Sequence, residues 1–302
     1  MITLEKAKNI FELLENRTVI NITVLKGGYA GDVFKISTDQ GSQVLKLYEK
    51  EDTDVESTDD RVYGSNHANL QSAHALLKQN DISTFELLNY GEIEGYTFAI
   101  FSLLDGIEVN NEIVQSKTFA ETLACIHGIT RGYQGWVVND KAYTLSWRDA
   151  FIESTYSRLH DVKNIITTKL YIQVKDFIDS KSSYFENPTK YVLSHLDGLQ
   201  ALFKLTENVW HLSGVIDVED YQFTDQRFVL SGITLNEKLG RYSLPFSFWE
   251  IYQSVTPIES TFKEFETFFQ TYYLLTWIEV LSNVTEEQNK CISLLSEITK
   301  NN

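Results

Sequence analysis

The chain has 302 residues, 43% of them hydrophobic and 13% aromatic, a composition typical of a globular protein with room for two lobes. Its formal net charge of -16 argues against a nucleic-acid partner, because a phosphate backbone binds clustered lysine and arginine side chains. The same charge is compatible with a cationic substrate, although solubility is the simpler explanation of the total.

Helix and strand patterns alternate through the first hundred residues. Apolar side chains at helical spacing between Leu4 and Leu14 predict an amphipathic helix. Strands are predicted over residues 20–25, 33–36 and 43–48. The dense acids of residues 49–60 predict a solvated, mobile excursion. A helix at 66–79 follows, and then two strands at 85–90 and 96–101 joined by a hairpin turn at 91–95.

Three glycines, Gly27, Gly28 and Gly31, lie between the first two predicted strands. Glycine lets backbone amides approach phosphate oxygens without obstruction, so this turn is a candidate phosphate-covering loop. Lys46 lies inside the third strand, where its ammonium is a candidate phosphate-pairing cation. Taken alone, the glycines also fit an ordinary hairpin turn, and the lysine also fits an exposed edge strand.

The rest of the chain is mainly helical in pattern. Helical periodicity is predicted over residues 113–129, 147–159 and 165–178, and again from 228–233 onward. The aromatic run of residues 262–275 predicts a further helix, whose stripe of rings we interpret mainly as core. An aromatic and acidic wall in this region would also be able to hold a cation through ring faces and carboxylates.

Two short apolar runs in this region each lead to an aspartate. The run at 191–193 precedes Asp197, and the run at 212–216 ends at Asp217. The residues between them are long enough for a loop and a hairpin that brings the chain back alongside itself. Phosphoryl transfer needs such a pair, because one carboxylate orients a hydroxyl and accepts its proton while the other holds magnesium against the phosphates. An aspartate at a strand end is also a common turn residue.

In chain order, these features resemble the aminoglycoside phosphotransferase and choline kinase group, small-molecule kinases with a protein-kinase-like fold. The matching positions, from about residue 20 to residue 230, are the glycine turn, Lys46, the hinge-like segment 98–106, the helix 119–127, the motif His195-Leu196-Asp197 and the motif Gly214-Val215-Ile216-Asp217-Val218-Glu219-Asp220.

The resemblance implies a role for each matching residue. Lys46 would pair with the phosphates, Asp197 would orient the hydroxyl and act as base, and Asp217 would be the chief magnesium ligand. Backbone groups near Ser102 and Leu104 would pair with the edge of an adenine or guanine base. The histidine of the His-x-Asp motif would brace its loop, and His127 would likewise be a buried structural residue. Trp249, Glu250 and Trp277 lie in the lobe where members of that group bind substrate, which makes them candidates for holding a cation.

Two positions depart from the pattern of that group. Leu202 stands where the family has an asparagine that ligates metal, and leucine offers no oxygen to magnesium. The helix expected at 66–79 should carry a glutamate partner for Lys46, but its plausible positions hold Asn69, Leu70 and Gln71. We therefore expect Lys46 to lack an acidic partner and to be held less firmly.

We predict an α+β, bilobal protein-kinase-like fold, with a small antiparallel-sheet lobe over residues 1–104 and a mainly helical lobe over residues 105–302. The predicted function is transfer of the terminal phosphate of ATP or GTP, with Mg²⁺, to a hydroxyl of a small, aminoglycoside-like or choline-like molecule. Its net charge is compatible with a cationic acceptor. The alternative is a catalytically degenerate protein of the same fold that acts as a nucleotide-binding or interaction module.

The expected partner is a small molecule, with no nucleic acid and no membrane. Cys125 and Cys291 lie far apart and predict neither a disulfide framework nor a metal cluster. No run is apolar enough to span a bilayer, and Glu5 and Glu12 interrupt any secretory signal, so we expect a cytoplasmic protein. The acceptor, the choice of ATP over GTP and the oligomeric state are left open.

Overall fold

The computed structural model describes residues 2–25, 32–49, 67–139, 145–195, 198–281 and 284–300. The chain forms two compact units. Unit 1 comprises residues 1–56, 65–108 and 201–220, and unit 2 comprises residues 57–64, 109–200 and 221–302. Residues 201–220 therefore belong with the first hundred residues, while the predicted division at residue 104 remains a prediction.

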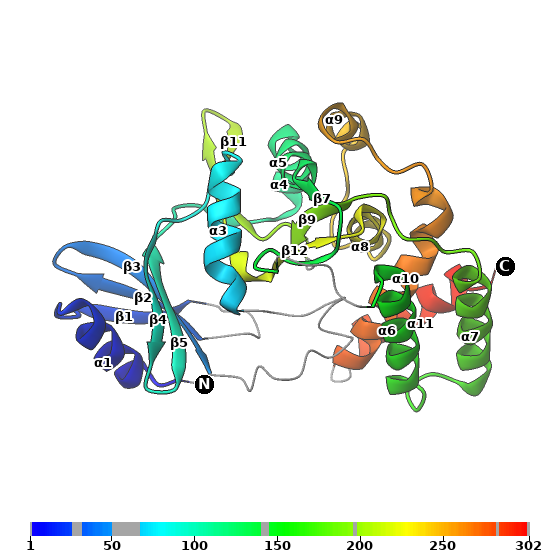
Figure 1. Ribbon diagram of the computed structural model, residues 1–302, viewed down its shortest axis with the longest axis horizontal. Helices are drawn as coiled ribbons and strands as arrows, with labels where there is room; N and C mark the ends of the chain where they lie inside the picture. The colour runs from blue at the N-terminus through cyan, green and yellow to red at the C-terminus, as the bar shows by residue number, and fades with distance from the viewer. Residues whose placement is uncertain are drawn as a thin grey trace. The chain divides into compact units, whose positions relative to one another are not determined.

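Unit 1 is built mainly of antiparallel strands, as its alternating sequence predicts. Its helical elements are α1 (Leu4–Glu15), η1 (His67–Asn69), α3 (Leu70–Gln79) and η2 (Val218–Asp220). One sheet has the strand order β1-β2-β3-β5-β4 (Figure 1), with the bounds β1 Asn21–Leu25, β2 Asp32–Thr38, β3 Gly41–Glu49, β4 Leu87–Ile93 and β5 Tyr96–Ser102. A second sheet has the order β11-β10-β6, with the bounds β6 Ile107–Glu108, β10 Ala201–Thr206 and β11 Val209–Val215.

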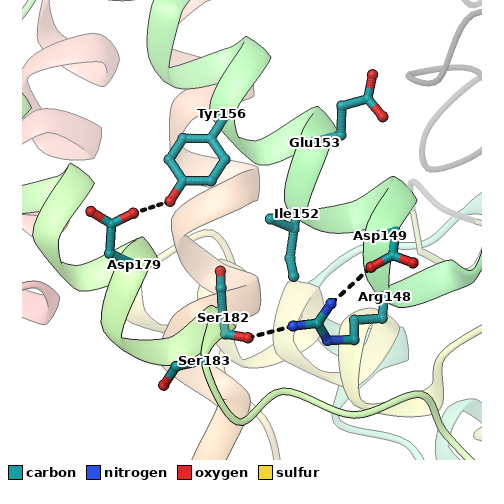
Figure 2. Close-up of a pocket in the computed structure, with 8 residues that line it drawn as sticks. All are labelled: Arg148, Asp149, Ile152, Glu153, Tyr156, Asp179, Ser182 and Ser183. Carbon is teal, nitrogen blue, oxygen red and sulfur yellow. Dashed lines mark hydrogen bonds and ion pairs between the residues drawn. The ribbon is translucent and has the colours of Figure 1, made fainter.

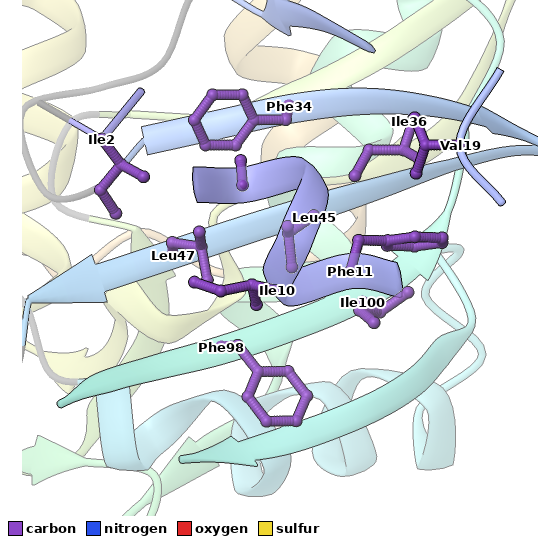
Figure 3. Close-up of a cluster of buried hydrophobic side chains, with 11 residues drawn as sticks. Ile2, Ile10, Phe11, Val19, Phe34, Ile36, Leu45, Leu47, Phe98 and Ile100 are labelled. Carbon is purple, nitrogen blue, oxygen red and sulfur yellow. The ribbon is translucent and has the colours of Figure 1, made fainter. Parts of the chain in front are cut away.

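Helix α1 packs on one face of the five-stranded sheet. Thr3 caps its start through its hydroxyl, and Asn16 ends it in the left-handed conformation, at φ 51°. The buried cluster beneath it, drawn in Figure 3, consists of Ile2, Ala7, Ile10, Phe11, Val19, Phe34, Ile36, Leu45, Leu47, Phe98 and Ile100. Because alternate strand residues face opposite sides, Lys46 lies on the other face of the sheet from Leu45 and Leu47.

The predicted hairpin after the first aspartate motif is confirmed as β10 and β11, which pair antiparallel. Its return strand passes very close to the segment that follows α3. A Cβ placed on Gly214 would lie 2.8 Å from Leu104 Cδ1 and 3.1 Å from Thr84 Cα, so a larger residue would push the strand away. Thr84 also forms a bridge to Val215. Glycine at this position therefore allows the close approach of the strand, three residues before Asp217.

Unit 2 is mainly helical, as predicted. Its described helices are α4 Asn111–Val114, α5 Lys117–Gly128, α6 Trp147–Asp161, α7 Thr168–Ser182, α8 Gln226–Lys238, α9 Phe248–Val255, α10 Phe262–Val280 and α11 Thr285–Ile298. A four-stranded antiparallel sheet has the order β7-β9-β12-β8, with the bounds β7 Thr130–Arg131, β8 Gly135–Trp136, β9 Tyr191–His195 and β12 Tyr221–Thr224.

The aromatic stripe of α10 lies in the core of unit 2, which confirms its interpretation from the sequence. Phe268, Phe269 and Tyr272 are buried and surround Phe151 of α6, with ring centroids 5.0–5.5 Å apart. Tyr273 stacks on Phe228 of α8, at 4.5 Å and 7° between the ring planes. Over the described residues, no helix has both the length and the apolar character needed to cross a membrane.

Two predicted boundaries are wrong in detail. The turn expected at 91–95 is shorter, because β4 continues to Ile93 and only Glu94 and Gly95 turn, both at positive φ. The helix expected at 113–129 is broken into α4 and α5 at Ser116, whose hydroxyl accepts from the N–H of Phe119 and starts a new helix. The acidic excursion predicted from residue 49 lies, after Glu49, outside the described residues.

Candidate functional site

Lys46 is a buried lysine in the interior of a sheet. Its strand β3 is flanked on both sides, since Lys46 is opposite Val33 of β2 and Ala99 of β5. The side chain is only 7% exposed. The edge-strand alternative for this lysine is therefore wrong, and its charge must be balanced inside the protein.

One of the acids that balance the charge of Lys46 is Asp217, the predicted metal ligand. The Nζ atom of Lys46 lies 2.7 Å from Oδ1 of Asp217. Asp217 follows the end of β11 and has φ 51°, a left-handed conformation that aspartate tolerates better than most residues. Its side chain keeps 33% exposure. These two predicted site residues, 171 positions apart, are thus brought together within unit 1.

A second acid, Glu219, also contacts Lys46, although the sequence analysis assigned it no role beyond its place in the matching motif. Lys46 Nζ also donates to Glu219 Oε1, and the Tyr48 hydroxyl donates to the same oxygen at 2.7 Å. The Asn69 side-chain amide donates to the backbone carbonyl of Glu219 at 3.0 Å. The expectation that Lys46 would lack an acidic partner is therefore wrong. The helix supplies no acid, but the turn η2 supplies one.

The spacing of Asp217 and Glu219 carried a signal that could have led to this pair. Two acids two residues apart follow β11, and the Asp220 N–H donates to the Asp217 carbonyl at 3.1 Å, which closes the tight turn between them. A missing helix acid is a reason to look for a replacement elsewhere. The sequence alone could not show that η2 lies beside Lys46, because that contact joins residues far apart in the chain.

The pKa values of this cluster follow from burial and from the two carboxylates. Burial alone would lower the pKa of Lys46, but the charges of Glu219 and Asp217 outweigh it and raise the pKa above its usual value. Burial, followed by the Glu219 carboxylate, raises the pKa of Tyr48 well above its usual value, so its hydroxyl remains a donor. One cation and two anions leave the cluster with a net negative charge.

A strand residue occupies the position at which the resembled group of kinases has a metal-ligating asparagine. Leu202 belongs to β10, where it is opposite Gly214 on one side and Glu108 on the other. Its side chain is hydrocarbon and cannot ligate magnesium. The departure seen in the sequence is therefore built into the sheet of unit 1.

The remaining predicted site residues are placed only in part. Ser102 ends β5, and its N–H donates to the carbonyl of Glu86 at 2.9 Å, while its hydroxyl accepts from the Glu86 N–H at 2.9 Å. Leu104 lies against Gly214. The glycine turn, Gly27, Gly28 and Gly31, and Asp197 fall outside the described residues, so their roles stay predictions.

In unit 2, a buried hydrogen-bond chain ends at the strand that leads to the His-x-Asp motif. His127 binds the Tyr252 hydroxyl through Nδ1 at 2.7 Å and the Ser194 hydroxyl through Nε2 at 3.3 Å. Because Ser194 donates to the carbonyl of His195 at 3.1 Å, its oxygen must accept from Nε2–H. Nδ1 is then the acceptor for Tyr252. Full burial lowers the pKa of His127 to about 3, so this histidine is neutral and structural.

The two tryptophan rings that are candidates for a cation site already contact cationic side chains of this chain. The Lys263 ammonium lies 5.7 Å from the centroid of the Trp249 ring, and the Arg241 guanidinium lies 4.1 Å from that of Trp277. These ring faces are therefore used within unit 2.

A surface cavity of about 370 Å³ lies between α6 and α7 and contains none of the predicted site residues. Figure 2 shows its lining, Arg148, Asp149, Ile152, Glu153, Tyr156, Asp179, Ser182 and Ser183. Several of its polar side chains form ion pairs or hydrogen bonds. Arg148 pairs with Asp149 at 2.8 Å, and Tyr156 donates to Asp179, which also pairs with Lys175 at 2.7 Å. The contacts around the cavity connect α6 to α7.

Among the residues that connect α6 to α7, Arg148 is the one whose loss should destabilise the fold most. It donates to the carbonyl of Ser182 at 2.8 Å, at the end of α7, and to that of Phe185 at 2.7 Å. We expect Arg148→Met to lower the free energy of unfolding by about 1–2 kcal/mol, measured by urea denaturation. The matched change Lys175→Met removes an exposed helix pair and should cost less than about 0.5 kcal/mol. Equal losses would contradict the assignment.

Comparison with known proteins identifies the fold. No protein-family model and no curated protein sequence matches the chain. Among solved structures, a candidate fructosamine-3-kinase from Haemophilus somnus is 18% identical, with a TM-score of 0.63 and 96% of each chain covered.

Two aminoglycoside phosphotransferases align over similar lengths. APH(4)-Ia in a ternary complex with AMP-PNP and hygromycin B is 12% identical, with a TM-score of 0.63, and the match covers 98% of this chain and 99% of that one. A variant of aminoglycoside 2′-phosphotransferase-IIIa in its GDP complex is 13% identical, with a TM-score of 0.67, covering 97% of this chain and 96% of that one. The predicted protein-kinase-like fold is confirmed, and at these identities the likeness concerns the fold alone.

Proposed function

We propose that the chain is a phosphotransferase that moves the terminal phosphate of ATP or GTP to a hydroxyl group of a small molecule. The observation that carries this proposal is the buried contact of Lys46 with Asp217. A lysine from a strand and an aspartate after a later strand are the pair that phosphoryl transfer uses for the phosphates and for the metal. Two solved proteins that share the fold are complexes with AMP-PNP and with GDP, which supports a nucleotide donor.

The residues present fit a magnesium ion that is held together with nucleotide phosphates. Magnesium takes oxygen ligands and is usually bound by one or two carboxylates, with water and phosphate completing its shell. Asp217 offers a partly exposed carboxylate, and in the described part of the chain no group of three His, Cys, Asp or Glu side chains forms a complete metal site. When bound, the ion supplies charge neutralisation at the phosphates.

The other roles extend the same proposal to residues known from the sequence. Lys46 binds the phosphates, and Asp197 orients the acceptor hydroxyl and receives its proton. The turn with Gly27, Gly28 and Gly31 covers the phosphates with backbone amides. Backbone groups near Ser102 and Leu104 pair with the base. The Ser102 N–H already donates to the carbonyl of Glu86. We therefore assign the backbone carbonyl groups of this segment to the base.

The acceptor that we favour is a hydroxylated small molecule with a positive charge. The net charge of -16 attracts cations, and the fold neighbour APH(4)-Ia is in complex with hygromycin B. We do not assign the cation to Trp249 or Trp277, because Lys263 and Arg241 already cover those rings.

The proposal is tested by measuring phosphate transfer from ATP and GTP to a panel of hydroxylated amines with Mg²⁺. Asp217→Asn is expected to reduce turnover by about 10²–10³-fold, because the carboxylate would hold the magnesium ion that neutralises phosphate charge in the transition state. Asp197→Asn should abolish turnover and leave nucleotide affinity nearly unchanged. Glu94→Gln is the control, since Glu94 is an exposed acid of unit 1 paired with Lys6. Undiminished turnover in Asp197→Asn or Asp217→Asn would remove the assigned role.

A second candidate function is a nucleotide-binding or interaction module without turnover. Leu202 favours it, because a hydrocarbon side chain replaces a metal ligand in a mechanism that depends on positioning and charge. Thermal unfolding with ATP or GTP, with and without Mg²⁺, separates the two. A ligand that binds the native state raises the unfolding temperature. Stabilisation that requires Mg²⁺ supports the enzyme, and no stabilisation by either nucleotide supports an interaction module.

A further inference from the structure

Two acids contact Lys46, and they differ in what else they touch. Glu219 is 1% exposed, and its Oε1 atom receives both Lys46 and Tyr48. Its backbone is fixed as well, because Asn69, itself fully buried, donates to its carbonyl. Asp217 has a third of its side chain exposed. Glu219 is therefore buried within unit 1, whereas Asp217 is partly exposed.

We propose that Glu219 is the positioning residue that holds Lys46, in place of the acid that helix α3 lacks. The proposal rests on the proposed function for its catalytic meaning, but its geometry stands on unit 1 alone. The N-cap residue of helix α3, Asn69, takes part by donating from its side-chain amide to the Glu219 backbone carbonyl. The helix therefore orients the acid and does not supply it.

The two carboxylates therefore have different roles. If Asp217 were the only partner of Lys46, an ion bound at Asp217 would deprive a buried lysine of its counter-charge, which is costly. With Glu219 in place, Lys46 keeps a buried carboxylate while Asp217 is used elsewhere. Glu219 lies in η2 and Asp217 immediately precedes it, so the lysine and the metal aspartate are assembled without any acid from α3.

The test measures how well each acid protects the Lys46 amine, with no nucleotide present. The protein is treated with an acetylating ester at one fixed pH, and the acetylation rate of each lysine is read by peptide mass spectrometry. We expect Glu219→Gln to speed acetylation of Lys46 at least tenfold and Asp217→Asn to speed it less. Glu86→Gln is the matched control, because it removes the exposed partner of Lys78 and should leave Lys46 unchanged.

Two milder variants keep the test decisive if Glu219→Gln fails to fold, which circular dichroism would show. Glu219→Asp shortens the acid, and Tyr48→Phe removes one hydrogen bond to it. Both are expected to speed acetylation of Lys46 by a few fold. An unchanged rate in every folded variant, or a larger effect of Asp217→Asn than of Glu219→Gln, would overturn the proposal.

A separate measurement distinguishes this proposal from the proposed function. Calorimetric titration of the wild-type chain with ATP or GTP and Mg²⁺ tests nucleotide binding by itself. Absence of binding would overturn the nucleotide role, while the acetylation rates would still decide whether Glu219 holds Lys46. If the nucleotide binds, Glu219→Gln should weaken its affinity by about tenfold or more, because the phosphate-pairing cation is then held by the metal ligand alone. Unchanged affinity would count against the positioning role.

Discussion

Replacing Asp225 by asparagine is expected to lower the free energy of unfolding by about 3–5 kcal/mol, the usual cost of removing one partner of a buried ion pair. Asp225 is fully buried and Arg227 is 3% exposed, and their side chains meet at 2.7 Å. The loss would leave the guanidinium charge inside unit 2 without the carboxylate that it contacts directly. Urea denaturation followed by circular dichroism measures the change.

The size of this effect follows from how many elements the pair joins. Asp225 caps α8 by accepting from the Arg227 N–H at 2.8 Å, and it also accepts from the Trp147 ring N–H at 3.3 Å. Arg227 donates to the carbonyl of Glu186 at 2.8 Å and to the Thr261 hydroxyl at 3.0 Å. The guanidinium thus ties α8 to two other segments of unit 2.

Two controls separate the buried charge from ordinary loss of a contact. Asp149→Asn removes an acid that pairs with an arginine at the surface, and it should cost less than about 1 kcal/mol. The double variant Asp225→Asn with Arg227→Met should be more stable than Asp225→Asn alone, because the uncompensated charge is gone. A single variant within about 1 kcal/mol of the wild type would show that the pair does not stabilise the fold in this way.

The fold was largely predictable because its elements follow from local periodicity. Strands and helices were predicted from their periods alone, and β3 was among them; its alternation leaves Lys46 on one face, while Leu45 and Leu47 of the other face join the cluster with α1. The helical pattern of α10 was equally clear, since its rings repeat at the spacing of a buried face. Local errors arose where one side chain overrides periodicity, as at Ser116, whose hydroxyl begins a new helix.

The candidate site was predictable only where a residue type and its chain position were enough. Lys46 and Asp217 were chosen on that basis, and they are in contact. Glu219 was assigned no role of its own, because its role depends on a contact across 173 positions with Lys46 and on Asn69 fixing its backbone. A sequence pattern reports which residues a helix lacks, but tertiary packing decides which residue replaces them.

Acid is expected to weaken the fold through His127. Burial lowers the pKa of this histidine from its ordinary value of 6.5 to about 3, so its folded form stays neutral over a range in which the unfolded chain takes up a proton. Above pH 6.5 neither state is protonated, and the residue adds no pH dependence. Between pH 6.5 and 3 the unfolded state binds the extra proton, so stability falls by about 1.4 kcal/mol per pH unit as the pH drops.

The measurement compares urea unfolding of the wild type and His127→Gln between pH 7 and pH 4.5. The variant should be less stable at pH 7, because its side chain cannot reproduce both hydrogen bonds, but its stability should fall less steeply with acid. Tyr252→Phe is the control. It removes a partner of His127 at 2.7 Å yet leaves the histidine buried, and the pKa of Tyr252 is itself raised by burial, so the phenol is neutral throughout. That control should keep the wild-type slope, since burial is the cause of the lowered pKa. Parallel slopes for the wild type and His127→Gln would mean that other groups cause the acid sensitivity.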